Sequence, residues 1–326
     1  IFLVATIIFF IYWIYTRKEF KEIKYTFLWD KALFDKLYSF FGWNLIGAIN
    51  GVASQNGLNI LLNLFFGPTI NAARGIAFQV SSAVNGFVSN FQLAMYPQIV
   101  KSYAKGDIQY MHNIIFKGAK YSFFLLFFIT LPILLETEII LQGWLIQVPE
   151  YTVIFCRLVI INILIDCISG SLMSGAQASG KIKYYHIIVG GLLLLVVPIS
   201  YSLLLLDYPP ESTFYVCITI SLMALFARLF ILKYLINLSF SHFIREVVLV
   251  VIGVSFIGVV LPLIIRLNFD SGVYRLIIVT TTSVLSISIS VYLLGLKKAE
   301  RVFINSYLIL FKKNIVFNFT NWLKKP

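Results

Sequence analysis

The chain has 326 residues, of which 60% are hydrophobic and only 12% are charged, and its mean hydropathy is +0.90. A soluble domain carries about 25% charged and about 45–50% apolar residues, so this composition excludes a soluble globular protein and predicts an integral membrane protein. The formal net charge is +12, and its meaning depends on how the basic residues are distributed along the chain.

Apolar runs of about 20 residues, the length of a helix that crosses a bilayer, occur nine times in the chain. They cover residues 1–16, 40–64, 72–97, 114–135, 152–174, 185–206, 213–236, 246–266 and 273–296. Turn signals rich in Gly, Pro, Asp, Asn or Ser, such as FFGPT and DYPPES, separate them. We therefore predict an all-α polytopic membrane protein with about nine transmembrane helices.

The basic residues alternate between the two sides of this predicted topology. Most of them lie in the segments 17–38, 101–120, 181–183, 233–245 and 297–325, whereas the opposite connections hold only Arg266 and Arg275. By the positive-inside rule the basic segments and the C-terminus face the cytoplasm, and residue 1 starts outside. The charge is therefore a topology signal that also attracts anionic membrane lipid, and no nucleic-acid partner is expected.

The two ends of the chain lead to further expectations. The chain begins with an apolar run that has no initiator Met and no basic segment before it, so we expect a C-terminal part of a longer protein. Residues 17–38 and the basic tail 297–326 alternate apolar and charged side chains at helical spacing. Such segments suit helices lying on the inner leaflet, and solvated connectors are the alternative.

The third apolar run carries polar residues on one side only. On a helix, one sector about 100° wide contains Asn71, Arg74, Ser81, Ser82, Asn85, Ser89 and Gln92. In the preceding run, Asn44, Gln55, Asn56, Asn59 and Asn63 share a similar sector. The short FFGPT turn predicts that the two helices are antiparallel neighbours, so the polar faces meet or line a common water-filled cavity. Alternatively, these side chains only join closely packed helices, with Gly75 and Gly86 allowing close approach.

Three further charged residues lie inside predicted spans. Arg157 enters its span at a depth similar to that of Arg74, and Arg228 is near enough to the cytoplasmic end to extend to the interface. Asp166 is the only acid well inside a span, and it lies nearly opposite Arg157 on the same helix. If Asp166 is charged its partner must come from another helix, and a protonated Asp166 bonded to a neighbour is the alternative.

The chemistry of these residues suits a particular class of cargo. Guanidinium groups bind phosphate or carboxylate through paired donors, while amides and hydroxyls suit sugars. The cysteines lie inside apolar runs and the histidines near the ends of such runs, so we predict no metal site and no cofactor.

Two runs of the chain resemble a known family. The run LLNLFFGPTINAARGIAFQVSSAVNGFVSNFQLAMYPQIVKSYAKGD (61–107) and the run GAQASGKIKYYHIIVGGLLLLVVPISY (175–201) look like the bacterial lipid-linked polysaccharide repeat-unit flippases. These O-antigen and capsule transporters belong to the superfamily that also contains the multidrug and toxic compound extruders and the lipid II flippase. The resemblance covers essentially the whole chain, and 61–107 is its most specific part.

The resemblance implies two six-helix lobes around a cavity that opens alternately to the two sides of the bacterial inner membrane. Residues 1–16 would then be the last span of an incomplete first lobe, 17–38 the cytoplasmic linker, 40–236 the second lobe and 246–296 an extra helix pair. The implied cargo is an undecaprenyl-pyrophosphate-linked oligosaccharide, and polysaccharide polymerase and assembly proteins are implied partners.

The expected substrate-binding residues combine cations for the head group with amides and hydroxyls for the sugars. They are Arg74, Arg157, Asn56, Asn59, Asn63, Asn85, Ser81 and Gln92, and Asp166 is a possible coupling or structural acid. A cation-coupled small-molecule exporter of the same fold is the nearest alternative. A membrane-embedded enzyme or a purely structural protein would be a different class, and no catalytic residues are predicted.

Overall fold

The computed structural model describes residues 2–20, 29–303 and 305–306, and within these ranges the regular structure is helical, with no β-strand. Six helical segments in this part of the chain are long and apolar enough to cross a membrane. They are 108–135, 152–178, 183–205, 212–236, 240–268 and 273–295. The prediction of an all-α polytopic membrane protein is therefore confirmed. That the other three apolar runs also cross the membrane stays a prediction.

The chain divides into two compact units, residues 1–42 and residues 43–326. In the first unit, α1 (Phe2–Glu19) contains the described part of the predicted first span and extends beyond it. Asp30 caps the start of α2 (Lys31–Ala104), because its Oδ1 accepts hydrogen bonds from the backbone N–H groups of Ala32 and Leu33 at 2.9 and 3.1 Å. Of the predicted interfacial linker 17–38, residues 21–28 lie outside the described residues and residues 31–38 form the first turns of α2.

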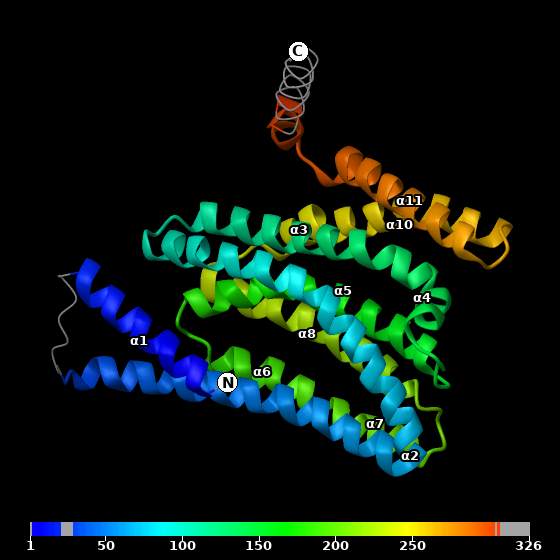
Figure 1. Cartoon of the computed structure of the whole chain (residues 1–326). Helices are drawn as coiled ribbons and strands as arrows, with labels where there is room; N and C mark the ends of the chain where they lie inside the picture. Colours follow the sequence, from blue (N-terminus) through cyan, green and yellow to red (C-terminus); the bar gives the residue numbers. More distant parts are fainter. Residues whose placement is uncertain (1, 21–28, 304, 307–326) are drawn as a thin grey trace, which may run out of the picture. The chain divides into compact units, whose positions relative to one another are not determined.

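Within the second unit α2 reverses direction at Gly67, whose φ of 80° and ψ of −175° interrupt the helix. This positive φ is readily available only to glycine, and Pro68 follows at the first helical position after the break, where its missing N–H costs nothing. In Figure 1 the first arm of α2 (43–66, blue) and the second arm (68–104, cyan) diverge from this turn. Hydrogen bonds from Arg74 to Asn59 and Gln55 join the arms as antiparallel neighbours.

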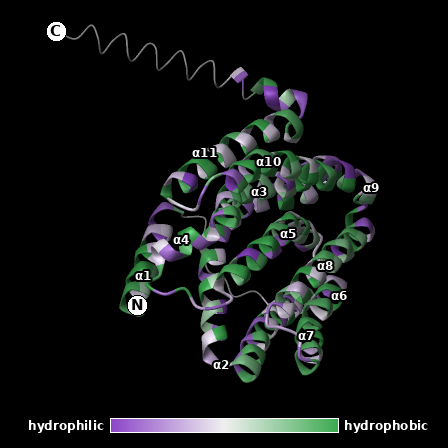
Figure 2. Cartoon of the chain, turned by 90° about the vertical axis from the view of Figure 1, so that its right-hand side faces the viewer, coloured by the Kyte–Doolittle hydropathy of each residue, from purple (hydrophilic) through white to green (hydrophobic). Residues whose placement is uncertain are grey.

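The remaining elements of the second unit follow α2 in short steps. They are α3 (Ile108–Leu135), α4 (Thr137–Trp144), α5 (Thr152–Ala178), α6 (Lys183–Leu194), α7 (Val196–Leu205), α8 (Ser212–Ile236), α9 (Phe240–Phe243), the π-helical η1 (Ile244–Val248), α10 (Leu249–Asn268), α11 (Val273–Ser290) and the π-helical η2 (Val291–Gly295). Hydrophobic residues predominate along these helices in Figure 2, as expected for elements surrounded by lipid.

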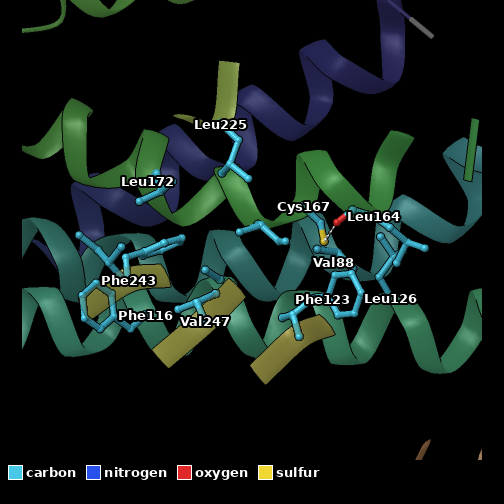
Figure 3. Close-up of a cluster of buried hydrophobic side chains, with 14 of the residues drawn as sticks. Val88, Phe116, Phe123, Leu126, Leu164, Cys167, Leu172, Leu225, Phe243 and Val247 are labelled. Atoms are coloured by element: carbon cyan, nitrogen blue, oxygen red, sulfur yellow. Dashed lines mark hydrogen bonds between the residues drawn. The ribbon is translucent and has the colours of Figure 1, made fainter. Parts of the chain in front are cut away.

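The largest apolar core of this unit surrounds α3. Phe116 of α3 packs edge-on against Phe243 of α9, with ring centroids 5.5 Å apart, beside Val247 (Figure 3). Leu172 of α5 and Leu225 of α8 belong to the same buried cluster. The helices α10 and α11, which cover most of residues 246–296, also pack on α3. That they are an extra pair outside a six-helix lobe stays a prediction.

Candidate functional site

Two adjoining cavities lie between the two arms of α2 and the helices α5 and α8. Their volumes are about 310 and about 360 Å³, within the ~300–1,000 Å³ typical of ligand sites. Both are lined by Gln55, Leu58, Arg74, Phe78, Asn162, Asp166 and Cys217. The first cavity adds Ser54, Ser169, Tyr185, Ser221 and Arg228, and the second adds Ser81, Ser82, Asn85, Ser89 and Gln92. Residues from helices far apart in the sequence therefore form one divided hollow, which polar side chains and apolar side chains such as Leu58 and Phe78 line together.

Arg74 lies where the two cavities meet and is only 4% exposed. One guanidinium nitrogen, Nη1, donates to Oδ1 of Asn59, and Nη2 donates to the backbone carbonyl of Gln55 at 3.2 Å. The guanidinium carbon lies 4.3 Å from the ring centroid of Phe78. Nε is buried and has no hydrogen-bond partner. All of these contacts are to neutral groups.

The environment of Arg74 therefore leaves its charge uncompensated. No acid in the described part of the chain forms an ion pair with it. A buried charge without a counter-ion is costly, and buried charges are normally paired. An anion in the hollow would supply the missing partner.

Arg228 is the second cation of the hollow, and our expectation that it extends to the cytoplasmic interface is wrong. It is 8% exposed, and it donates from Nε to the hydroxyl of Tyr185 at 3.1 Å and from Nη1 to Oγ of Ser169 at 3.0 Å. Its depth was evident from the sequence, but α8 presents it to α5 and α6 instead of to lipid. The signal that could have revealed this is the set of polar residues on those two neighbouring helices.

Asp166 lines both cavities and is surrounded by polar groups. Its Oδ2 accepts a hydrogen bond from Nδ2 of Asn162 at 3.0 Å, and Ser221 is a further hydrogen-bonding neighbour. Arg228 of α8 lines the first cavity together with Asp166, but no ion pair of Asp166 occurs in the described part of the chain. Whether Asp166 is charged or is protonated and bonded to a neighbour therefore stays open.

Some of the other expected site residues line the second cavity, and the rest line neither cavity. Ser81, Asn85 and Gln92 line the second cavity, whereas Asn59 reaches it only through its bond to Arg74. Four residues are absent from the lining of both cavities, namely Asn56, Asn59, Asn63 and Arg157. Asn56 and Asn63 are exposed on α2, and Nε of Arg157 lies 3.4 Å from Oγ1 of Thr137.

Gln92 also joins three helices. Its Nε2 donates to Oγ of Ser122 on α3 at 3.0 Å and to the backbone carbonyl of Cys167 on α5 at 2.8 Å. Gly170 allows this approach, because a Cβ there would lie 2.1 Å from Oε1 of Gln92. By contrast, a Cβ at Gly75 or Gly86 would meet nothing within 4 Å. Close packing therefore depends on glycines other than the two expected from the sequence.

No group of three or more His, Cys, Asp or Glu side chains that could hold a metal ion occurs among residues 2–20, 29–303 and 305–306. Comparison of the chain with protein-family models, with curated proteins and with solved structures found no match. It is therefore the chemistry of the hollow itself that points to a function.

Proposed function

We propose that the protein is a transporter that flips an undecaprenyl-pyrophosphate-linked oligosaccharide from the cytoplasmic to the outer leaflet by alternating access. The observation that carries the proposal is Arg74, a buried cation that has only neutral partners at the junction of two cavities. A pyrophosphate would supply its counter-charge, and Arg is suited to phosphate because its donors bind two oxygens at once.

The second cavity supports a sugar-bearing cargo. Ser81, Ser82, Asn85 and Ser89 present hydroxyl and amide groups along one side of it, and such groups can both donate to and accept from sugar hydroxyls. Apolar residues predominate along the helices (Figure 2), which suits a lipid tail that stays in the bilayer while the head group crosses. The resemblance of 61–107 to the polysaccharide repeat-unit flippases supports the choice of carrier lipid.

This function places the protein in the bacterial inner membrane with its C-terminus in the cytoplasm. Residues 40–236 would form a six-helix lobe of the transporter, in contact with membrane lipid and with polysaccharide polymerase and assembly proteins. Transport of this kind requires no covalent chemistry, so we propose that the protein is not an enzyme.

The decisive experiment is complementation in a strain that lacks the full-length gene. The deletion should cause lipid-linked repeat units to accumulate on the cytoplasmic leaflet, and the wild-type gene should clear them. Arg74→Ala should insert normally but fail to clear them, because it removes the buried cation. Arg266→Ala, an arginine near the end of α10 and outside both cavities, is the matched control. Normal surface polysaccharide in the Arg74→Ala strain would remove Arg74 from the site.

A cation-coupled small-molecule exporter of the same fold is the second candidate, and Asp166 favours it. This acid lines both cavities beside Asn162, where binding of a proton or a metal cation would change the charge of the hollow. That function requires efflux that depends on a proton or sodium gradient and fails in Asp166→Asn. It also requires that deletion leave lipid-linked intermediates at their normal level.

A further inference from the structure

We infer that Asn59 is a positioning residue that holds Arg74 so that an anion binds the side of the guanidinium that carries Nε. This inference rests on the proposed function, because it concerns the same anion site. It also separates Asn59 from Asn56 and Asn63, with which it shares a helix face in the sequence.

The hydrogen bonds of Arg74 limit the direction from which an anion can approach it. Both terminal nitrogens of Arg74 already donate to the first arm of α2, Nη1 to Asn59 and Nη2 to the backbone carbonyl of Gln55. Nε is buried and unpartnered. A guanidinium offers five N–H donors in one plane. An anion that approaches from the side can therefore bind the free Nε together with the remaining hydrogen of a terminal nitrogen. The end of the guanidinium is occupied by the protein.

The contacts of Arg74 also fix the orientation of its guanidinium plane. Phe78 lies 4.3 Å from the guanidinium carbon and lines both cavities, so it covers one face of the group. Asn59 and Gln55 hold its end from the opposite arm. A free Arg side chain has considerable rotamer entropy to lose on binding, and these contacts remove part of that freedom before the ligand arrives. Binding to a group that is already oriented is tighter for this reason.

The residue type at position 59 affects both the orientation and the charge of Arg74. An asparagine oxygen accepts the bond from Nη1 without adding charge, so the guanidinium keeps its full attraction for an anion. An aspartate would make the same contact but would neutralise Arg74. An alanine would keep the charge and lose the orientation. The two substitutions therefore separate positioning from charge.

The test uses the purified full chain in lipid nanodiscs with inorganic pyrophosphate as the probe, and binding is measured by titration calorimetry. Asn59→Ala should weaken binding about tenfold, the scale of one hydrogen bond to a charged group. Asn59→Asp should abolish measurable binding, as should Arg74→Gln. Asn90→Ala, an exposed asparagine on the second arm that lines neither cavity, should bind as the wild type does.

Two results would overturn the inference in different ways. If Arg74→Gln abolishes binding while Asn59→Ala binds like the wild type, Asn59 does not position Arg74 and the proposed anion site stands. If Arg74→Gln binds pyrophosphate normally, the anion site itself is wrong. If Asn59→Ala does not fold, the nearly isosteric Asn59→Asp tests the inference instead. Undiminished pyrophosphate binding by Asn59→Asp would contradict the contact between residue 59 and Arg74.

Discussion

Arg275 at the start of α11 forms a two-point ion pair with Glu136 at the end of α3. Its Nη2 donates to Oε2 at 3.0 Å, and its Nε lies 3.0 Å from Oε1. In the first half of α3, Nζ of Lys117 lies 3.3 Å from Oε1 of Glu300, and Nζ of Lys120 lies 3.9 Å from Oε2. Ion pairs therefore connect α3 both to α11 and to the segment that follows η2.

The spacing along α3 leads to an expectation about where these pairs lie relative to the membrane. Lys120 and Glu136 belong to one continuous helix and its C-cap, and at about 1.5 Å per residue they are separated by about 24 Å. The hydrocarbon core of a bilayer is about 30 Å thick. We therefore expect each ion pair to lie toward one interface, where charges are least costly.

We expect Arg275→Ala to destabilise the protein more than Glu136→Gln. Glu136 is 1% exposed, so removal of Arg275 leaves a buried carboxylate unpaired, at a cost of up to about 3–5 kcal/mol. Glu136→Gln leaves the more accessible arginine, whose side chain is 16% exposed, free to reach water. Thermal unfolding of the two variants in detergent measures the difference. Equal unfolding midpoints of the two variants would contradict the expected cost of leaving the buried carboxylate of Glu136 unpaired.

The contact of Glu300 with α3 should be lost in acid. Partial burial favours the neutral carboxyl, but hydrogen bonds from Tyr121 and from the backbone N–H of Lys297, together with the charge of Lys120, outweigh it and lower the pKa of Glu300 below its ordinary value of 4.5. A carboxyl with a lowered pKa stabilises the fold fully above its unfolded pKa, and that contribution disappears as the pH falls through the folded pKa.

The corresponding measurement compares the melting temperatures of the wild type and Glu300→Gln between pH 7 and pH 3. We expect the wild type to be more stable at pH 7 and the two curves to converge below pH 4.5. A difference that is constant over this range would show that the charge of Glu300 does not stabilise the contact.

Gly170→Ala should disrupt the hollow, because its Cβ would lie 2.1 Å from Oε1 of Gln92. To relieve this clash Gln92 must leave its bonds to Ser122 and to the backbone carbonyl of Cys167. We expect a loss of about 1–3 kcal/mol, typical of overpacking, and reduced transport. Gly86→Ala is the control, since its Cβ meets nothing within 4 Å. Equal stability of the two variants would contradict the packing at Gly170.

Cys217 offers a direct probe of the hollow. It lines both cavities and is partly exposed, whereas Cys156 lines neither and is 0% exposed, and Cys167, which lines the second cavity, is only 5% exposed. A small water-soluble methanethiosulfonate should therefore modify Cys217 first, and pyrophosphate should slow the reaction. Mass spectrometry of the labelled protein identifies the modified residue. The water-filled hollow would be ruled out if Cys217→Ser left the rate and extent of labelling unchanged.

Much of the architecture was predictable because it depends on local and additive properties of the chain. Hydropathy summed over about 20 residues identifies segments that suit a bilayer, and FFGPT ends one helix and starts the next at Gly67. Helical periodicity likewise placed Arg74 and Asn85 on one side of the second arm, and both line the hollow. These properties require no knowledge of what lies opposite each helix.

Only the tertiary structure decided which polar side chains meet. Asn56, Asn59 and Asn63 share a helix face, but only Asn59 contacts Arg74, because the turn at Gly67 sets which residues of the two arms lie opposite each other. Arg228 faces inward because Tyr185 and Ser169, on other helices, accept its hydrogen bonds. Composition and periodicity describe one helix at a time, whereas the pairing of charges and their partners depends on how separate helices pack.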